Sequence, residues 1–111
     1  MISSAYFGRG ITNAAPPAFT IAATGGSGTN IAGANFAVAA GKATGNAVGG
    51  DLILQTSDAT ASGTTLQSLT TKMIVKASGN VGVGTIAPSS TLHVVGTFQA
   101  TATSTLASSL V

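Results

Sequence analysis

The chain has 111 residues, of which 64 are Ala, Gly, Ser or Thr and only six carry a formal charge. This length allows one domain at most, and the absence of cysteine excludes disulfide frameworks, thiolate metal sites and cysteine nucleophiles. One histidine and two aspartates, with no glutamate, are too few groups for general acid–base catalysis. We therefore expect no enzyme, no catalytic residues, and no bound cofactor or metal.

The first 18 residues are predicted to form a lead-in segment before the first repeat. Pro16 and Pro17 stand near its end, and proline cannot donate a hydrogen bond to a strand ladder. The pair therefore favours the edge of a sheet or the start of the first coil.

Five short segments between residues 19 and 96 place two large apolar residues on either side of a variable one. Because successive side chains of a strand point to opposite faces, each segment would turn both large residues to one face. Together the pairs predict an apolar seam that forms the core. Its ten members are Phe19, Ile21, Phe36, Val38, Leu52, Leu54, Met73, Val75, Leu92 and Val94.

The seam segments follow one another at intervals of 16 to 21 residues. A loose repeat of this length indicates the coils of a β-solenoid, or the rungs of a fibre that several chains wind together. An antiparallel meander within one chain fits the same residues. Turns are predicted where glycine, serine and asparagine collect, at residues 25–28, 41–46, 49–51, 62–63 and 78–80.

The last segment, 97–111, has two interpretations. Four apolar residues from Phe98 to Leu110 are spaced as on a helix, but the threonines and serines among them favour extended chain. We therefore predict a C-terminal strand or connector that follows a β-repeat shaft at 19–96.

The sequence GNVGVGT at residues 79–85 and the sequence IAPSSTLHVVG at residues 86–96 resemble a motif in the shafts of bacteriophage tail fibres and related bacterial surface fibres. The Gly- and Thr-rich stretch at 6–78 looks like the same fibres more loosely. Family members more often carry isoleucine at the Val83 position. The resemblance implies a homotrimeric, β-structured shaft on a virion tail fibre or a cell surface.

We therefore expect an all-β chain in an elongated, trimeric, β-helix or β-prism-like fibre shaft with short strands and glycine-rich turns. Its function would be mechanical, and contact with a cell-surface receptor would belong to other parts of such a fibre. The six scattered charges indicate no nucleic-acid partner. The uncharged run at 10–41 is too polar for membrane insertion.

Two other assemblies fit the sequence. In an extracellular filament, a terminal strand of one chain, from residues 1–12 or 97–111, would complete the sheet of the next chain. In a single-chain β-solenoid, the Thr-x-Thr steps at residues 101–105 would belong to a platform that binds carbohydrate or ice. These threonines do not recur at the repeat spacing, so the fibre shaft is the leading hypothesis.

Three further features have both a functional and a structural interpretation. His93 could meet its symmetry copies at a metal ion, but its place in the last seam segment turns it away from the seam, where a solvated or hydrogen-bonded ring is expected. The stretch 49–52 is similar to part of a calcium-binding repeat, but is better explained as a turn before a strand. The Gly-x-Gly steps at 26–28 and 82–84 indicate turns or close backbone packing.

Overall fold

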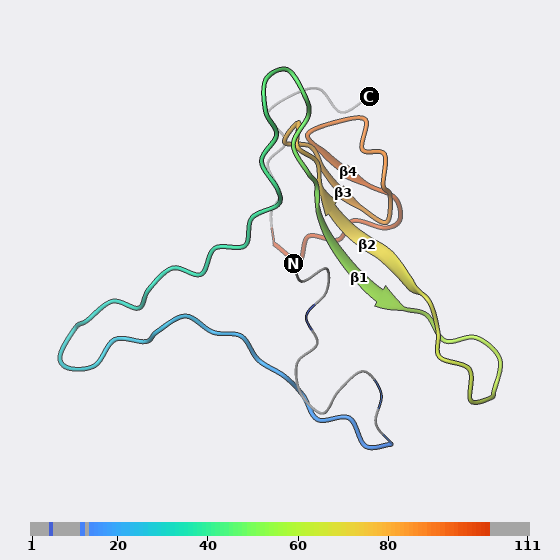
Figure 1. Cartoon of the computed structure of the whole chain (residues 1–111), viewed down its shortest axis with the longest axis horizontal. Helices are drawn as coiled ribbons and strands as arrows, with labels where there is room; N and C mark the ends of the chain where they lie inside the picture. The colour runs from blue at the N-terminus through green and yellow to red at the C-terminus, as the bar shows by residue number, and fades with distance from the viewer. Residues whose placement is uncertain (1–4, 6–11, 13, 103–111) are drawn as a thin grey trace. The chain divides into compact units, whose positions relative to one another are not determined.

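The computed structural model describes residues 5, 12 and 14–102, and the chain divides into two compact units, Met1–Val38 and Ala39–Val111. The described residues of the first unit form no helix or strand, whereas the second unit contains a β-sheet (Figure 1). All of the regular secondary structure in the described part of the chain therefore belongs to the second unit.

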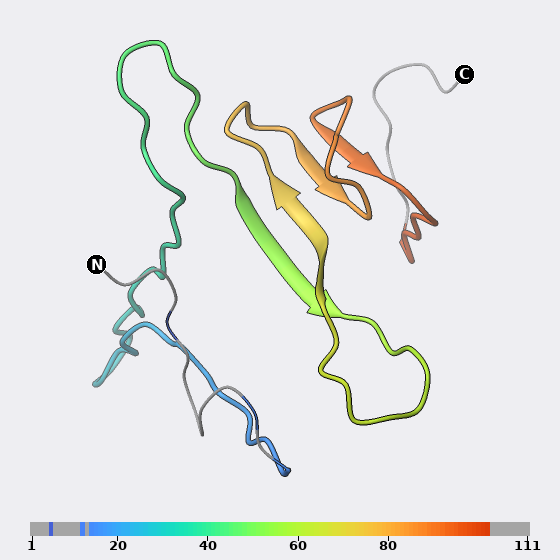
Figure 2. The ribbon, with the colours of Figure 1, turned by 45° about the vertical axis from the view of Figure 1, so that its right-hand side comes forward.

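The second unit is built around one mixed sheet with the strand order β1-β2-β3-β4 (Figure 2). β1 (Leu52–Ser57) and β2 (Leu69–Val75) form an antiparallel pair, β3 (Val81–Val83) is antiparallel to β2, and β4 (Leu92–Val94) is parallel to β3. Valine, isoleucine and threonine, which favour extended backbone, are frequent in these strands. The prediction of an all-β chain is confirmed for the described residues.

Three of the five predicted strand segments lie in this sheet, namely residues 52–54, 73–75 and 92–94. The prediction is wrong for residues 19–21 and 36–38, which are not strands. Alternating apolar residues favour an extended chain, but a strand also needs a neighbour to which it is hydrogen bonded along its length. That neighbour cannot be identified from the local pattern.

The connections within the sheet are those of an antiparallel meander from β1 to β3, followed by a parallel return to β4. Of the two connectivities that the sequence left open, the meander thus describes three of the four strands. Four of the predicted turn regions contain a turn or bend, and Gly45 and Gly79 adopt positive φ values of 58° and 95° there. The predicted turn at residues 49–51 is not formed. Instead, the Gly50 N–H donates to the Gly41 C=O (2.9 Å) and closes the loop between these two glycines.

The large side chain that the sheet buries best is Ile74, which is 4% exposed. It lies opposite Ile53 of β1 and Gly82 of β3, and so on the face away from the seam residues of the sheet. The expectation that the seam forms the core is therefore wrong within one chain. The reason is steric, since a Cβ on Gly82 would lie 3.1 Å from Ile74 Cγ2, and its absence gives the isoleucine room.

The glycine at position 82 also brings two stretches of backbone together. Its added Cβ would lie 2.5 Å from the carbonyl oxygen of Thr85. Gly26, in the other Gly-x-Gly step, is similarly close to the carbonyl oxygen of Ile31. Close backbone packing is thus confirmed at both steps, although β3 is not among the five predicted strand segments.

The ends of the chain are described only in part. Residues 97–102 form no strand and 103–111 lie outside the described residues, so a C-terminal strand or connector at 97–111 stays a prediction. The predicted shaft at 19–96 includes the boundary between the two units, which follows Val38. Its own limits at residues 18 and 96 stay a prediction.

We expect the substitution Gly82→Ala to destabilise the sheet. The new methyl group has no space beside Thr85 and Ile74, and such overpacking costs about 1–3 kcal/mol of unfolding free energy. Urea unfolding at one fixed protein concentration measures the loss. Gly41→Ala is the control, because nothing lies within 4 Å of its added Cβ. Equal stability of the two variants would contradict the packing described here.

Candidate functional site

The strand register gathers apolar side chains from all four strands on one face of the sheet. Residues that pair directly across neighbouring strands share a face, and here they form two rows, each with one residue from every strand. No polar residue interrupts either row. This set, the apolar face, consists of Leu52, Val75, Val81 and Leu92 in one row and Leu54, Met73, Val83 and Val94 in the other.

The apolar face is incompletely covered by the described chain. None of its eight side chains is buried, and Leu54 and Leu92 are 54% and 57% exposed. Each Å² of apolar surface left in water forgoes about 25 cal/mol of burial free energy. Contiguous exposed apolar patches of this kind mark interaction surfaces more often than single exposed residues do.

Six of the ten predicted seam residues lie on the apolar face, since β1, β2 and β4 each contribute two. Val81 and Val83 are not among the predicted seam residues, although they show the same spacing around a glycine. The other four seam residues belong to the first unit and are not in the sheet. The structure thus brings together the part of the seam that follows residue 50.

His93 lies on the opposite face, in one row with Ile53, Ile74 and Gly82. It is half-buried, its Nδ1 accepts a hydrogen bond from the Ser89 N–H (3.3 Å), and the Ser89 hydroxyl is 3.4 Å from the same nitrogen. The ring is therefore hydrogen bonded on the side away from the apolar face. Within residues 5, 12 and 14–102, no three histidine, aspartate or glutamate side chains gather as metal ligands.

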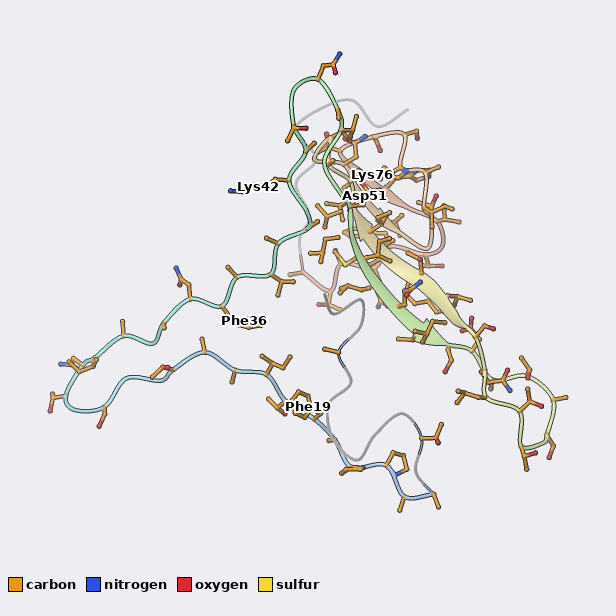
Figure 3. All side chains as sticks on the ribbon, viewed as in Figure 1. Phe19, Phe36, Lys42, Asp51 and Lys76 are labelled. Carbon is orange, nitrogen blue, oxygen red and sulfur yellow. The ribbon has the colours of Figure 1, made fainter. Side chains whose placement is uncertain are left out.

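An ion pair joins the start of β1 to the end of β2. Lys76 Nζ lies 2.6 Å from Asp51 Oδ2, and the Ala77 N–H donates to Asp51 Oδ1 (2.8 Å), so both oxygens of this carboxylate are engaged. Figure 3 labels both charged side chains. Asp51 thus binds a lysine and a backbone N–H. In the described chain, the carboxylate of the 49–52 stretch therefore has a structural role.

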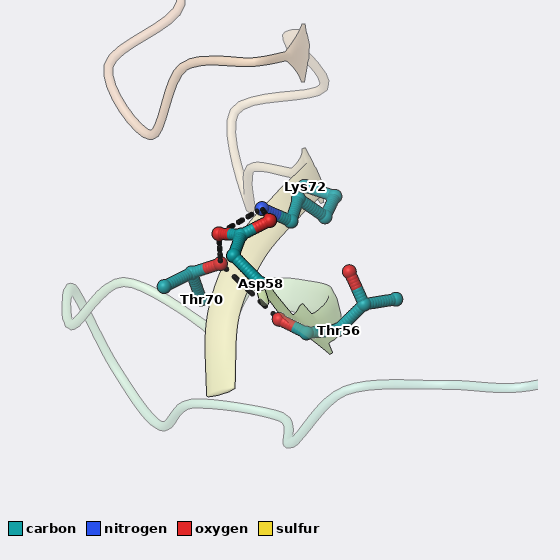
Figure 4. A network of polar contacts seen from close by, with 4 residues as sticks. All are labelled: Thr56, Asp58, Thr70 and Lys72. Carbon is teal, nitrogen blue, oxygen red and sulfur yellow. Dashed lines mark hydrogen bonds and ion pairs between the residues drawn. The ribbon is translucent and has the colours of Figure 1, made fainter. Parts of the chain in front are cut away.

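A second ion pair joins the other ends of the two strands. Lys72 Nζ is 2.6 Å from the Asp58 carboxylate, and the Thr70 hydroxyl lies within hydrogen-bond distance of Asp58 Oδ2 (3.0 Å) and of the Thr56 carbonyl oxygen (3.1 Å) (Figure 4). The register shifts in β2 next to this pair, so that Lys72 is the extra residue of a β-bulge. At this bulge, the Lys72 side chain contacts Asp58, which directly follows β1.

Neither ion pair was predicted, because the charges are scattered along the sequence. The available signal was their position, because Asp51 and Asp58 flank β1, while Lys72 lies within β2 and Lys76 directly follows it. An antiparallel pairing of the two strands brings these residues together. The pKa of Asp51 is lowered mainly by the hydrogen bond from Lys76, and next by the one from the Ala77 N–H. The pKa of Asp58 is lowered mainly by the hydrogen bond from Lys72, and next by the one from Thr70.

Comparison of the chain with models of known families, with curated proteins and with solved structures gives no match. No helix in the described ranges is long and apolar enough to cross a membrane. The apolar face and the ion pairs at its borders are therefore the features on which a function can be argued.

We expect acid to destabilise the β1–β2 pair. Both aspartates have a lowered pKa in the folded chain, so their stabilisation is complete above the ordinary value of 3.8 and is lost as the pH falls through the lower folded values. Thermal unfolding midpoints between about pH 6 and about pH 2 measure this loss. In a double variant with Asp51→Asn and Asp58→Asn, the unfolding midpoint should depend less on pH than in the parent protein. If the midpoints of variant and parent fall in parallel as the pH is lowered, the ion pairs do not have this role.

Proposed function

We propose that the chain is a non-enzymatic subunit of a fibre shaft and that it assembles as a homotrimer through β-structure. The observation that carries the proposal is the apolar face, whose eight side chains are half-buried or exposed in the described chain. Copies that turn this face toward one another would remove it from water. Self-association is then driven by the hydrophobic effect, as in obligate oligomers.

The charge distribution of the sheet supports self-association. The charged side chains beside the sheet form pairs within the chain, Asp51 with Lys76 and Asp58 with Lys72. Burying an uncompensated charge at an interface costs far more than apolar contact returns. Copies can therefore approach over the apolar face without leaving a buried charge unpaired.

The proposed number of copies and the proposed location of the fibre both rest on a resemblance. Residues 79–96 resemble the shafts of tail fibres and bacterial surface fibres. Three copies around one axis would give a β-prism whose interior is the apolar face. Val81 and Val83, which belong to that face, lie within the resembling segment itself. A location on a virion tail fibre or on a cell surface is part of the same proposal.

An extracellular filament is the second candidate function. The observation in its favour is that β1 ends the sheet and has no strand on its outer side in the described part of the chain. Most of the terminal residues expected to complete a neighbouring sheet, from 1–12 and 97–111, lie outside the described residues. The same is true of residues 103–105, on which the alternative of a carbohydrate- or ice-binding platform depended.

The substitution Leu54→Asp tests the proposal. Leu54 is 54% exposed in the single chain, so the sheet tolerates a polar residue there, but assembled copies would bury an unpaired carboxylate. We expect the parent protein to have the mass of three chains in light scattering, and the variant to have the mass of one. A filament would instead give an open series of masses.

Leu66→Asp is the matched control, because this leucine is 73% exposed in the loop between β1 and β2 and is not part of the apolar face. It should assemble like the parent protein. A parent protein that is a stable monomer at micromolar concentration would refute the proposal.

A further inference from the structure

The apolar face contains one sulfur-bearing side chain, on an inner strand of the sheet. The chain has no cysteine and two methionines, Met1 and Met73, of which Met73 lies among the described residues. Met73 belongs to β2 and pairs with Leu54 of β1 on one side and with Val83 of β3 on the other. The other seven members of the apolar face are valines and leucines. Met73 is therefore the member of this face that a mild oxidant can modify.

The Met73 side chain is accessible in part. It is half-buried, and its cross-strand partners Leu54 and Val83 are 54% and 38% exposed. No described element covers the apolar face, so a small oxidant can approach this side chain from the solvent side of the sheet. Burial of the face in an assembly would close that approach.

The surroundings of Met73 offer no partner to a polar group. Both rows of the apolar face are apolar from β1 to β4, and Val75 is the next residue of β2 on the same face. Lys72, which precedes Met73, is already paired with Asp58 (2.6 Å). An oxygen atom placed on the Met73 sulfur would therefore depend on water for its hydrogen bonds.

The sheet of the single chain does not depend on the Met73 side chain. The strands are held together by backbone pairing on both sides of β2, and Ile74, the best-buried large residue, lies on the opposite face. A polar atom on Met73 would face water in the single chain. Its cost arises only when the apolar face is buried, because the atom would then lose its water.

We propose that Met73 is an oxidation site whose modification by a peroxide prevents self-association. A lone pair of the thioether sulfur attacks one peroxide oxygen, the O–O bond breaks and a sulfur–oxygen bond forms. The sulfur is oxidised to the sulfoxide, and hydrogen peroxide is reduced to water. The inference rests on the proposed function, since it assigns a regulatory modification to the face through which the copies associate.

Reversal of the modification requires a separate reductant. The chain has no thiol that could reduce the sulfoxide, so the thioether is restored by methionine sulfoxide reductases, one for each sulfoxide epimer. Treatment with both enzymes should therefore return the oxidised protein to its assembled form.

Peroxide treatment of the full chain tests the proposal. The parent protein is oxidised in urea and refolded, and trypsin then releases the peptide 73–76 between Lys72 and Lys76, which reports on Met73 separately from Met1. We expect this peptide to gain one oxygen atom. Self-association, measured by light scattering, should weaken at least about tenfold, because a hydrogen-bond acceptor would be buried without a donor. Circular dichroism should show an unchanged β-sheet signal.

Three variants isolate the effect of position 73. Met73→Leu removes the sulfur at nearly constant volume, so it should assemble like the parent protein before and after peroxide, although its Met1 is still oxidised. Adding Leu66→Met to this variant places a methionine in the loop between β1 and β2, at a site where leucine is 73% exposed, and should leave assembly insensitive to peroxide. Met73→Gln carries a polar side chain without any oxidant and should assemble as weakly as the oxidised parent.

The rate of oxidation in the folded protein is an independent measurement. We expect the peptide 73–76 to be oxidised more slowly at protein concentrations where the parent is assembled than at dilutions where it is a single chain. The Leu66→Met methionine is the control, since its rate should not change with concentration. A Met73 that resists peroxide in the folded single chain would contradict the proposal.

The outcomes separate this inference from the proposed function. Equal assembly with and without oxygen on Met73 would overturn the inference and leave the fibre shaft intact. Loss of assembly in peroxide-treated Met73→Leu, or loss of the β-sheet signal on oxidation of the parent, would also overturn it. An untreated parent protein that stays monomeric at micromolar concentration would refute the proposed function, and this inference with it.

Discussion

The antiparallel register of β1 against β2 is the interaction on which the rest of this structure depends. It pairs Leu52 with Val75 and Leu54 with Met73 on one face of the sheet. On the other face it pairs Ile53 with Ile74. A slip of one residue would exchange the two faces of a strand. The two ion pairs and the bulge in β2 accompany this register, and each ion pair stabilises it by joining residues near both strands.

The two faces of the sheet differ in what covers them. One holds the residue that the single chain buries, and the other is the apolar face that the proposed assembly would bury. On one face, the missing Cβ of Gly82 admits the Ile74 side chain, which is the best-buried large residue of the described chain. On the other face, eight apolar side chains form two complete rows that no described element buries. A chain with so few bulky residues buries one isoleucine on the first face by itself, and burying the apolar face requires a further surface.

The sequence by itself determined the all-β class, three of the four strands and which of their residues share a face, because alternation along a strand is a local property. Only the tertiary structure decided that 19–21 and 36–38 are not strands, that β3 is one, and that Asp51 pairs with Lys76 and Asp58 with Lys72. It also decided that Ile74 is the buried residue. These features depend on pairing register and on the space beside one glycine, which involve residues distant in the chain.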